Sequence, residues 1–193
     1  MKISKKDLVG FENRIRDLYE QGKIKTPIHL SGGNEEELLD IFKKIKKEDW
    51  VFSTWRSHYH ALLKSEDRDC LEKEILRGNS MHINSRKHKI FTSSIVGGIL
   101  PIALGTALAL KKKRSKEHVW CFVGDMASEM GMFEECTKYA GGYNLPITFV
   151  VEDNGLGVYT PTGKVWKQGK ANVISYKYKR KYPHHGIGKF VSF

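Results

Sequence analysis

The sequence predicts an α/β fold with three layers, in which helices flank a parallel β-sheet. Two apolar runs, residues 119–123 and 145–151, each end in polar residues, and apolar residues recur at helical spacing between them. Short apolar runs of this kind are typical of buried parallel strands. As neighbours in the sheet, the two strands would bring Asp125 and Asn154 together at their carboxyl ends, where open α/β sheets bind ligands.

The chain has 193 residues, 40% of them hydrophobic, which suits one folded domain with a sizeable core. We expect residues 1–163 to form this domain and residues 164–193 to form a short basic tail, packed on it or on a partner. No apolar run approaches the ~20 residues that a membrane-spanning helix needs, so no membrane association is expected. The charged amphipathic start differs from a signal or transit peptide. Together with an odd number of cysteines and no CxxC spacing, this predicts a reducing, cytoplasmic location.

The formal net charge of +11 leaves nucleic acid, an acidic partner or an anionic substrate as candidates for binding. Lysine and arginine gather at 43–47, 111–116 and 177–181 rather than along one regular face. Such clusters are typical of solvated helix ends and loops, so we do not expect nucleic acid as a partner. Segment 176–182, where tyrosines alternate with basic residues, is the best candidate for such binding, although a strand with alternating faces explains it equally well.

The other elements follow from periodicity and turn signals along the chain. Residues 4–21 place their apolar side chains on one face of a helix, and Gly22 ends it. A polar turn over 25–36 leads into a second helix, and residues 50–54 form the first strand. Two further helices are expected, a short charged one and an apolar one rich in small residues, at 67–77 and 102–112.

The predicted sheet edge carries a specific chemistry. Asp125 and Asn154 offer hard oxygen atoms, which suit Mg²⁺ or Ca²⁺ and are poor ligands for zinc. A helix beginning just after Asp125 directs free N–H groups to the same edge, which favours an anionic phosphate. A metal beside a helix N-terminus indicates a diphosphate site. On periodicity alone, an α/β core that binds no nucleotide and has two polar strand ends explains these residues equally well.

The central stretch also matches a known motif, through Gly124-Asp125, Gly131, Phe133 with Glu135, Leu145-Pro146 and Glu152-Asp153-Asn154. It resembles the thiamine diphosphate motif and, more narrowly, the α subunit of the two-chain 2-oxo acid dehydrogenase E1 components. Met126 and Asp153 depart from that pattern, because the family has Gly and Asn there. The resemblance implies the thiamine diphosphate-binding fold, with thiamine diphosphate and Mg²⁺ as cofactors. This chain would be a short member of the family.

The resemblance implies a role for each residue of the central motif. The metal ligands would be Asp125, Asn154 and the main-chain carbonyl of Leu156. The diphosphate would lie against the backbone at three positions adjoining Asp125: Gly124, Met126 and Ala127. If the backbone at residue 126 needed a positive φ, methionine would cost about 1 kcal/mol or more, whereas the first position of a helix accepts it without strain.

Further site residues are implied by similar loops elsewhere in the chain. His29 would face the reactive carbon of the cofactor, and Arg56 would hold the diphosphate with Trp55 beside it. The backbone of Val96 would contact the aminopyrimidine ring, and His82 would lie near the entrance as a second catalytic candidate. The alternative for His29 is a histidine that merely lies in a turn, and for Arg56 it is a surface arginine at a helix start. The alternative for His82 is a structural histidine in a loop.

The implied function is that of an α-type subunit. The enzyme would decarboxylate a small-molecule 2-oxo acid and transfer the acyl-level fragment to an acceptor. The glutamate that activates the cofactor would come from a β-type subunit, in an α₂β₂ assembly. Two alternatives stay open: a transketolase-like split enzyme that moves a two-carbon unit between sugars, and a non-catalytic scaffold subunit with a degenerate cofactor site.

Overall fold

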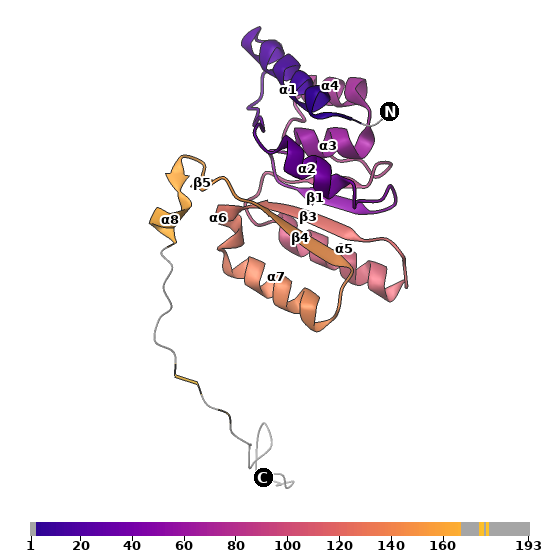
Figure 1. Ribbon diagram of the computed structural model, residues 1–193, viewed down its shortest axis with the longest axis vertical. Helices are drawn as coiled ribbons and strands as arrows, with labels where there is room; N and C mark the ends of the chain where they lie inside the picture. Colours follow the sequence, from indigo (N-terminus) through magenta and orange to yellow (C-terminus); the bar gives the residue numbers. More distant parts are fainter. Residues whose placement is uncertain (1–2, 167–173, 176, 178–193) are drawn as a thin grey trace, which may run out of the picture.

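The computed structural model describes residues 3–166, 174–175 and 177 of the chain. Its centre is one sheet of four strands in the order β2-β1-β3-β4, and all three pairings are parallel (Figure 1). The strands are β1 (Trp50–Ser53), β2 (Ile90–Thr92), β3 (Val119–Gly124) and β4 (Ile147–Glu152). This arrangement confirms the predicted α/β class with a parallel sheet.

Helices cover both faces of the sheet and complete the three layers (Figure 1). One face carries α1 (Lys5–Glu20), α2 (Glu35–Phe42), α3 (His58–Ser65) and α4 (Arg68–Leu76). The other face carries α5 (Ile99–Lys112) and α7 (Gly131–Gly142). Because successive side chains of a strand point to opposite faces, Phe122 of β3 packs under the first group, while Cys121 and Val123 pack under the second.

The first helix forms as its sequence pattern predicts. Ser4 and Asp7 make a capping box, in which each side chain binds the other residue's backbone N–H group. The apolar face of α1 is buried, at Leu8, Phe11, Ile15 and Leu18. This burial, rather than intrinsic helix propensity, holds α1 against α2 and α3.

The neighbouring strands β3 and β4 differ in how deeply they are buried. β3 lies between β1 and β4, and Phe122 in its middle is fully buried. β4 is one of the two edge strands, and its residues are half-buried or exposed, with Val151 42% exposed. β2 has only three residues, which is too short for hydrophobic periodicity to reveal, and the sequence analysis missed it.

Small elements follow β3 and β4 where these strands end. α6 (Asp125–Ser128) comes directly after β3, and β5 (Leu156–Gly157), β6 (Thr160–Pro161) and α8 (Thr162–Val165) come after β4. β5 and β6 pair as an antiparallel hairpin. The predicted boundary between residues 163 and 164 falls inside α8, and most of the tail, including nearly all of segment 176–182, lies outside the described residues.

In the described part of the chain, no helix combines the length and the apolar character needed to cross a lipid bilayer. Cys121 and Cys136 are buried and Cys70 is exposed, and all three are free thiols. Burial raises the pKa of the Cys121 thiol, so this group stays protonated.

Candidate functional site

Asp125 and Asn154 follow adjacent strand ends, as the sequence predicts. Gly124 of β3 is in register with Glu152 of β4, so the segments that follow these two strands leave the sheet side by side. Asp125 begins α6 and is only 6% exposed, whereas Asn154 lies in an exposed turn. A buried carboxylate at this edge needs polar partners or a cation, because burial of an unpaired charge is costly.

The hairpin after β4 provides one such partner. The Thr162 hydroxyl donates a hydrogen bond to the Asp125 carboxylate, so the segment from 155 to 162 folds over that residue. Met126 is helical and is not one of the residues with positive φ, which places it at a helix position without strain. Its side chain packs on Gly157, where an added Cβ would lie 2.5 Å from the Met126 methyl carbon.

The turn after β4 orders the other two predicted metal ligands. Asn154 Oδ1 accepts a hydrogen bond from the Leu156 N–H group at 3.0 Å, and Asp153 Oδ1 accepts one from Gly155 at 2.8 Å. Each of these oxygens keeps a second lone pair. The described residues hold no group of three His, Cys, Asp or Glu side chains that could bind a metal. One carboxylate, one amide oxygen and one carbonyl are nevertheless a donor set that fits Mg²⁺.

Buried polar atoms without a hydrogen-bond partner gather beside this carboxyl edge of the sheet. Within the described residues, all buried side-chain nitrogen and oxygen atoms without a hydrogen-bond partner belong to residues 26–60. They lie in the loop after α1, at the end of β1 and at the start of α3: Thr26, His29, Ser31, Asn34, Ser53, Ser57, His58 and His60. Two of these atoms, His58 Nδ1 and His60 Nε2, lie 3.6 and 3.3 Å from a glutamate carboxylate. An unpaired buried polar group costs about 1–3 kcal/mol, so the remaining atoms fit a surface at which a polar ligand would supply partners.

Two glutamates, the buried Glu12 and the half-buried Glu152, hold these polar residues in place, and neither role was predicted from the sequence. Glu152 accepts a hydrogen bond from Asn34 Nδ2 at 3.1 Å and lies 3.3 Å from His60 Nε2. Glu12 accepts one from the Ser31 N–H group at 2.8 Å and lies 3.6 Å from His58 Nδ1. The signal for Glu12 was present in the sequence, because a charged residue interrupts the apolar face of α1 at helical spacing.

The structure brings together His29, Trp55 and Arg56, three residues for which the family resemblance implies a place near the cofactor. The rings of His29 and Trp55 meet edge to face at 6.1 Å between centroids. The Arg56 guanidinium donates to the Leu30 carbonyl, which fixes the exposed arginine next to the His29 loop. Burial lowers the pKa of His29, and the charge of Arg56 lowers it further, so His29 is neutral at pH 7.

This electrostatic coupling predicts the response of His29 to the loss of the Arg56 charge. In Arg56→Leu, the pKa of His29 should rise, because the protonated imidazole no longer faces a fixed positive charge. It should stay below its ordinary value, since burial remains the larger cause. Arg56→Lys keeps the charge and is the matched control. Titration of the His29 ring by NMR measures the effect, and an unchanged or lower pKa in Arg56→Leu would refute the coupling.

His82 and Val96 lie on two loops that contact each other. His82 is exposed, and its Nε2 atom lies 3.3 Å from the Ser94 hydroxyl. Val96 is 51% exposed, and the next residue, Gly97, packs on Met130, which lies between α6 and α7. The loop that carries Val96 therefore adjoins the segment that follows Asp125. Within the described residues, no hydrogen bond or ion pair joins His82 or Val96 to His29 or Asp125, so their assigned roles stay predictions.

The Gly97 position allows a direct test of this loop's packing. Gly97 has φ +73°, and an added Cβ would lie 3.0 Å from the Met130 methyl carbon. Gly97→Ala should therefore lower the free energy of unfolding by about 1–3 kcal/mol, from backbone strain and overpacking. Gly105→Ala is the matched control, because Gly105 is helical and exposed, with nothing within 4 Å of the added Cβ. Urea unfolding measures both, and equal effects would contradict the assigned packing.

Fold and site together define an α/β domain with a buried aspartate and an oxygen-rich turn at the carboxyl edge of a parallel sheet. Comparison with known proteins assigns its family. The chain belongs to the dehydrogenase E1 component family, whose model matches residues 5–177. This membership confirms the resemblance to E1 α subunits, which the central motif indicates.

Among its relatives, the α subunit of acetoin:2,6-dichlorophenolindophenol oxidoreductase from Bacillus subtilis is 35% identical over 165 residues, covering 80% of this chain and 50% of that protein. The chloroplastic pyruvate dehydrogenase E1 component subunit alpha-3 of Arabidopsis thaliana is 32% identical over 184 residues, covering 84% and 43%. The acetoin oxidoreductase α subunit from Cupriavidus necator is 34% identical over 155 residues, covering 75% and 46%. The chain thus spans about half the length of these curated relatives.

Proposed function

We propose that this chain is an α-type subunit of a thiamine diphosphate-dependent enzyme of the 2-oxo acid dehydrogenase E1 class, and that it binds the diphosphate–Mg²⁺ end of the cofactor. The observation that carries the proposal is the buried Asp125 carboxylate at the end of β3, next to the Asn154 turn. Membership of the E1 family and the unpaired polar atoms at residues 26–60 support it.

In this proposal, Asp125, Asn154 Oδ1 and the Leu156 carbonyl hold Mg²⁺, because all three are hard oxygen ligands. Arg56 neutralises phosphate charge, and the N–H groups of Met126 and Ala127 donate to phosphate oxygens. When bound, thiamine diphosphate supplies the carbanion chemistry by which a 2-oxo acid loses CO₂.

In the same proposal, His29 and Trp55, with the loops of Val96 and His82, bind and orient the cofactor. His29 is neutral, and its buried Nδ1 atom lacks a partner, so the ring can exchange a proton with a bound group at neutral pH. Trp55 packs against that ring and fixes its plane. The Val96 loop would meet the base of the cofactor, and His82 would flank the entrance.

We propose that a β-type subunit completes the active site in an α₂β₂ assembly. Within the described residues, the glutamates nearest the candidate site, Glu12 and Glu152, are engaged with Ser31, Asn34 and buried histidines. They are therefore poor candidates for activating the cofactor. The names of the relatives as alpha subunits support a partner of another type.

Co-purification of the chain with a β-type partner, followed by assays on two substrate classes, tests the function. The proposal predicts Mg²⁺- and thiamine diphosphate-dependent decarboxylation of a 2-oxo acid with an artificial electron acceptor, and no transfer between ketose phosphates. Activity on ketose phosphates alone would favour the transketolase-like alternative. No cofactor binding with any partner would favour the scaffold alternative and overturn the proposal.

A further inference from the structure

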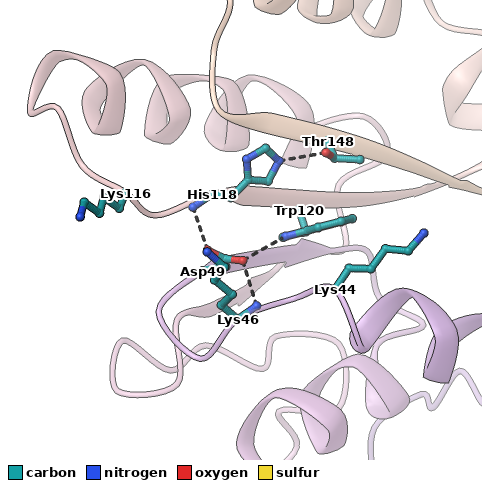
Figure 2. Close-up of a pocket in the computed structure, with 7 residues that line it drawn as sticks. All are labelled: Lys44, Lys46, Asp49, Lys116, His118, Trp120 and Thr148. Atoms are coloured by element: carbon teal, nitrogen blue, oxygen red, sulfur yellow. Dashed lines mark hydrogen bonds between the residues drawn. The ribbon is translucent and has the colours of Figure 1, made fainter.

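A hollow lies at the end of the sheet opposite Asp125, at the amino ends of β1, β3 and β4 (Figure 2). It encloses about 350 Å³, within the range of small-molecule sites, which is roughly 300–1,000 Å³. Its lining is mainly basic and aromatic: Lys44, Lys46, Asp49, Lys116, His118, Trp120 and Thr148. None of these residues takes part in the proposed cofactor site.

The hollow is preformed, because one buried carboxylate ties its two walls together. Asp49 is 2% exposed, and its Oδ1 atom accepts a hydrogen bond from the His118 N–H group at 2.9 Å. Its Oδ2 atom accepts from the Lys46 N–H group at 2.9 Å and from Trp120 Nε1 at 3.3 Å. The loop before β1 and the segment before β3 are therefore held together, with Lys44 and Lys116 at opposite ends of the hollow in Figure 2.

Two further lysine side chains hold the loop before β1, which forms one wall of the hollow. The Lys64 ammonium donates to the carbonyls of Lys46 and Lys47, at 2.8 and 3.0 Å. The Lys89 ammonium donates to the Glu48 carbonyl at 2.9 Å and pairs with Glu117 at 2.9 Å. These bonds use the backbone acceptors of the loop and leave its lysine side chains available at the rim.

The available charge in the hollow is positive. Within the described residues, no ion pair involves Lys44, Lys46 or Lys116, whereas several other lysines do form ion pairs. Asp49 offsets one of these three charges, but its oxygen atoms are already engaged by three N–H donors. Burial lowers the pKa of His118, and the neutral ring pairs with the Thr148 hydroxyl at 2.9 Å. Among the described residues, the cationic groups of the lining are thus three lysine ammonium groups, none of which is in an ion pair.

We propose that this hollow binds a small, soluble polyanion carrying phosphate groups, at a site separate from the cofactor edge. Lysine ammonium groups are compact charges that bind phosphate oxygens without requiring a fixed fork geometry. Their position on both sides of a preformed hollow favours a ligand with more than one negative charge. Because the hollow is open to solvent, the binding should weaken as ionic strength rises.

The indole N–H signal of Trp120 reports on this site directly, because that group binds Asp49 at the floor. The experiment titrates sodium tripolyphosphate into the ¹⁵N-labelled full chain at constant ionic strength, with Trp120→Phe to assign the signal. We expect a saturable shift at Trp120 and none with the same Kd at Trp55. The double variant Lys44→Ala/Lys116→Ala should raise the Kd by roughly tenfold or more. Lys73→Ala/Lys138→Ala removes two exposed lysines on α4 and α7, helices that do not line the hollow, and is the matched control, which should leave the Kd unchanged.

Four outcomes would overturn the proposal. The first is an equal shift with sodium chloride, and the second is an unchanged Kd in the Lys44→Ala/Lys116→Ala variant. The third is loss of the Trp120 response in Asp125→Ala, which would place the ligand at the cofactor edge. The fourth is a response to anionic lipid vesicles but not to tripolyphosphate, which would indicate a lipid headgroup. Loss of cofactor binding alone, with the tripolyphosphate response retained, would leave this site standing while refuting the proposed function.

Discussion

Asp125→Ala is expected to lower the magnesium-dependent affinity for thiamine diphosphate by about 100-fold or more, the usual effect of truncating one partner of a buried charge interaction. The carboxylate is the one charged ligand in the proposed metal set, and it is buried at the end of the central strand β3. Quenching of tryptophan fluorescence during a cofactor titration at fixed Mg²⁺ measures the effect, with the chain and its β-type partner together.

Asp153→Ala is the matched control for this change. Asp153 lies in the exposed turn after β4, and its side chain binds only the Gly155 backbone N–H group. Its removal should change the affinity little. Asp125→Asn keeps the size of the side chain and its bond from Thr162, which separates loss of the charge from loss of the fold. Equal affinities in Asp125→Ala and the unaltered chain would refute the proposed metal site.

Phe122→Ala should lower the free energy of unfolding by about 3–5 kcal/mol, because it opens a cavity between the central strand β3 and the helices that cover this face. The Phe122 ring is fully buried, lies 4.5 Å from the His60 ring and stacks on Phe42 at 5.9 Å between centroids. A loss of this size corresponds to a fall in Tm of roughly 10 °C for a chain of this length. Guanidinium unfolding and thermal unfolding both measure it.

Phe149→Ala on the edge strand β4 removes the same side-chain atoms and is the matched comparison. Phe149 is half-buried and packs on Phe133 at 5.7 Å between centroids. Less apolar surface leaves water at an edge strand, so the same truncation should cost about half as much or less. If the two variants lost equal stability, the assignment of β3 as the buried centre and β4 as the edge would be wrong.

The sequence predicts those parts of the fold in which one physical signal dominates. The buried face of α1 and the neighbouring positions of β3 and β4 follow from hydrophobic periodicity and from the polar residues that end each run. β2 was missed because its three residues carry no period. The helix expected after Asp125 is divided into α6 and α7, with Met130 as the N-cap of α7, and residue spacing does not reveal such a break.

In the candidate site, residues indicated by a local motif could likewise be predicted, whereas contacts that join distant segments could not. The motif placed Asp125 and Asn154 after adjacent strands, which the sheet register bears out, and the structure places His29 close to Trp55 and Arg56, while the cofactor roles of these residues stay predictions. The bond from Thr162 to Asp125 was not predictable, because it joins residues 37 positions apart through an exposed hairpin. The contact of Glu152 with His60 and Asn34 was likewise hidden, since it depends on how three separate segments meet.

The most direct test of the central claim is an isothermal titration of thiamine diphosphate into the chain with its β-type partner, in the presence of Mg²⁺ and again after its removal by a chelator. The account predicts saturable binding with Mg²⁺ that is lost on chelation and restored by added Mg²⁺. Binding of equal affinity with and without Mg²⁺, or no binding under either condition, would contradict the claim that Asp125 and the Asn154 turn form a diphosphate–metal site.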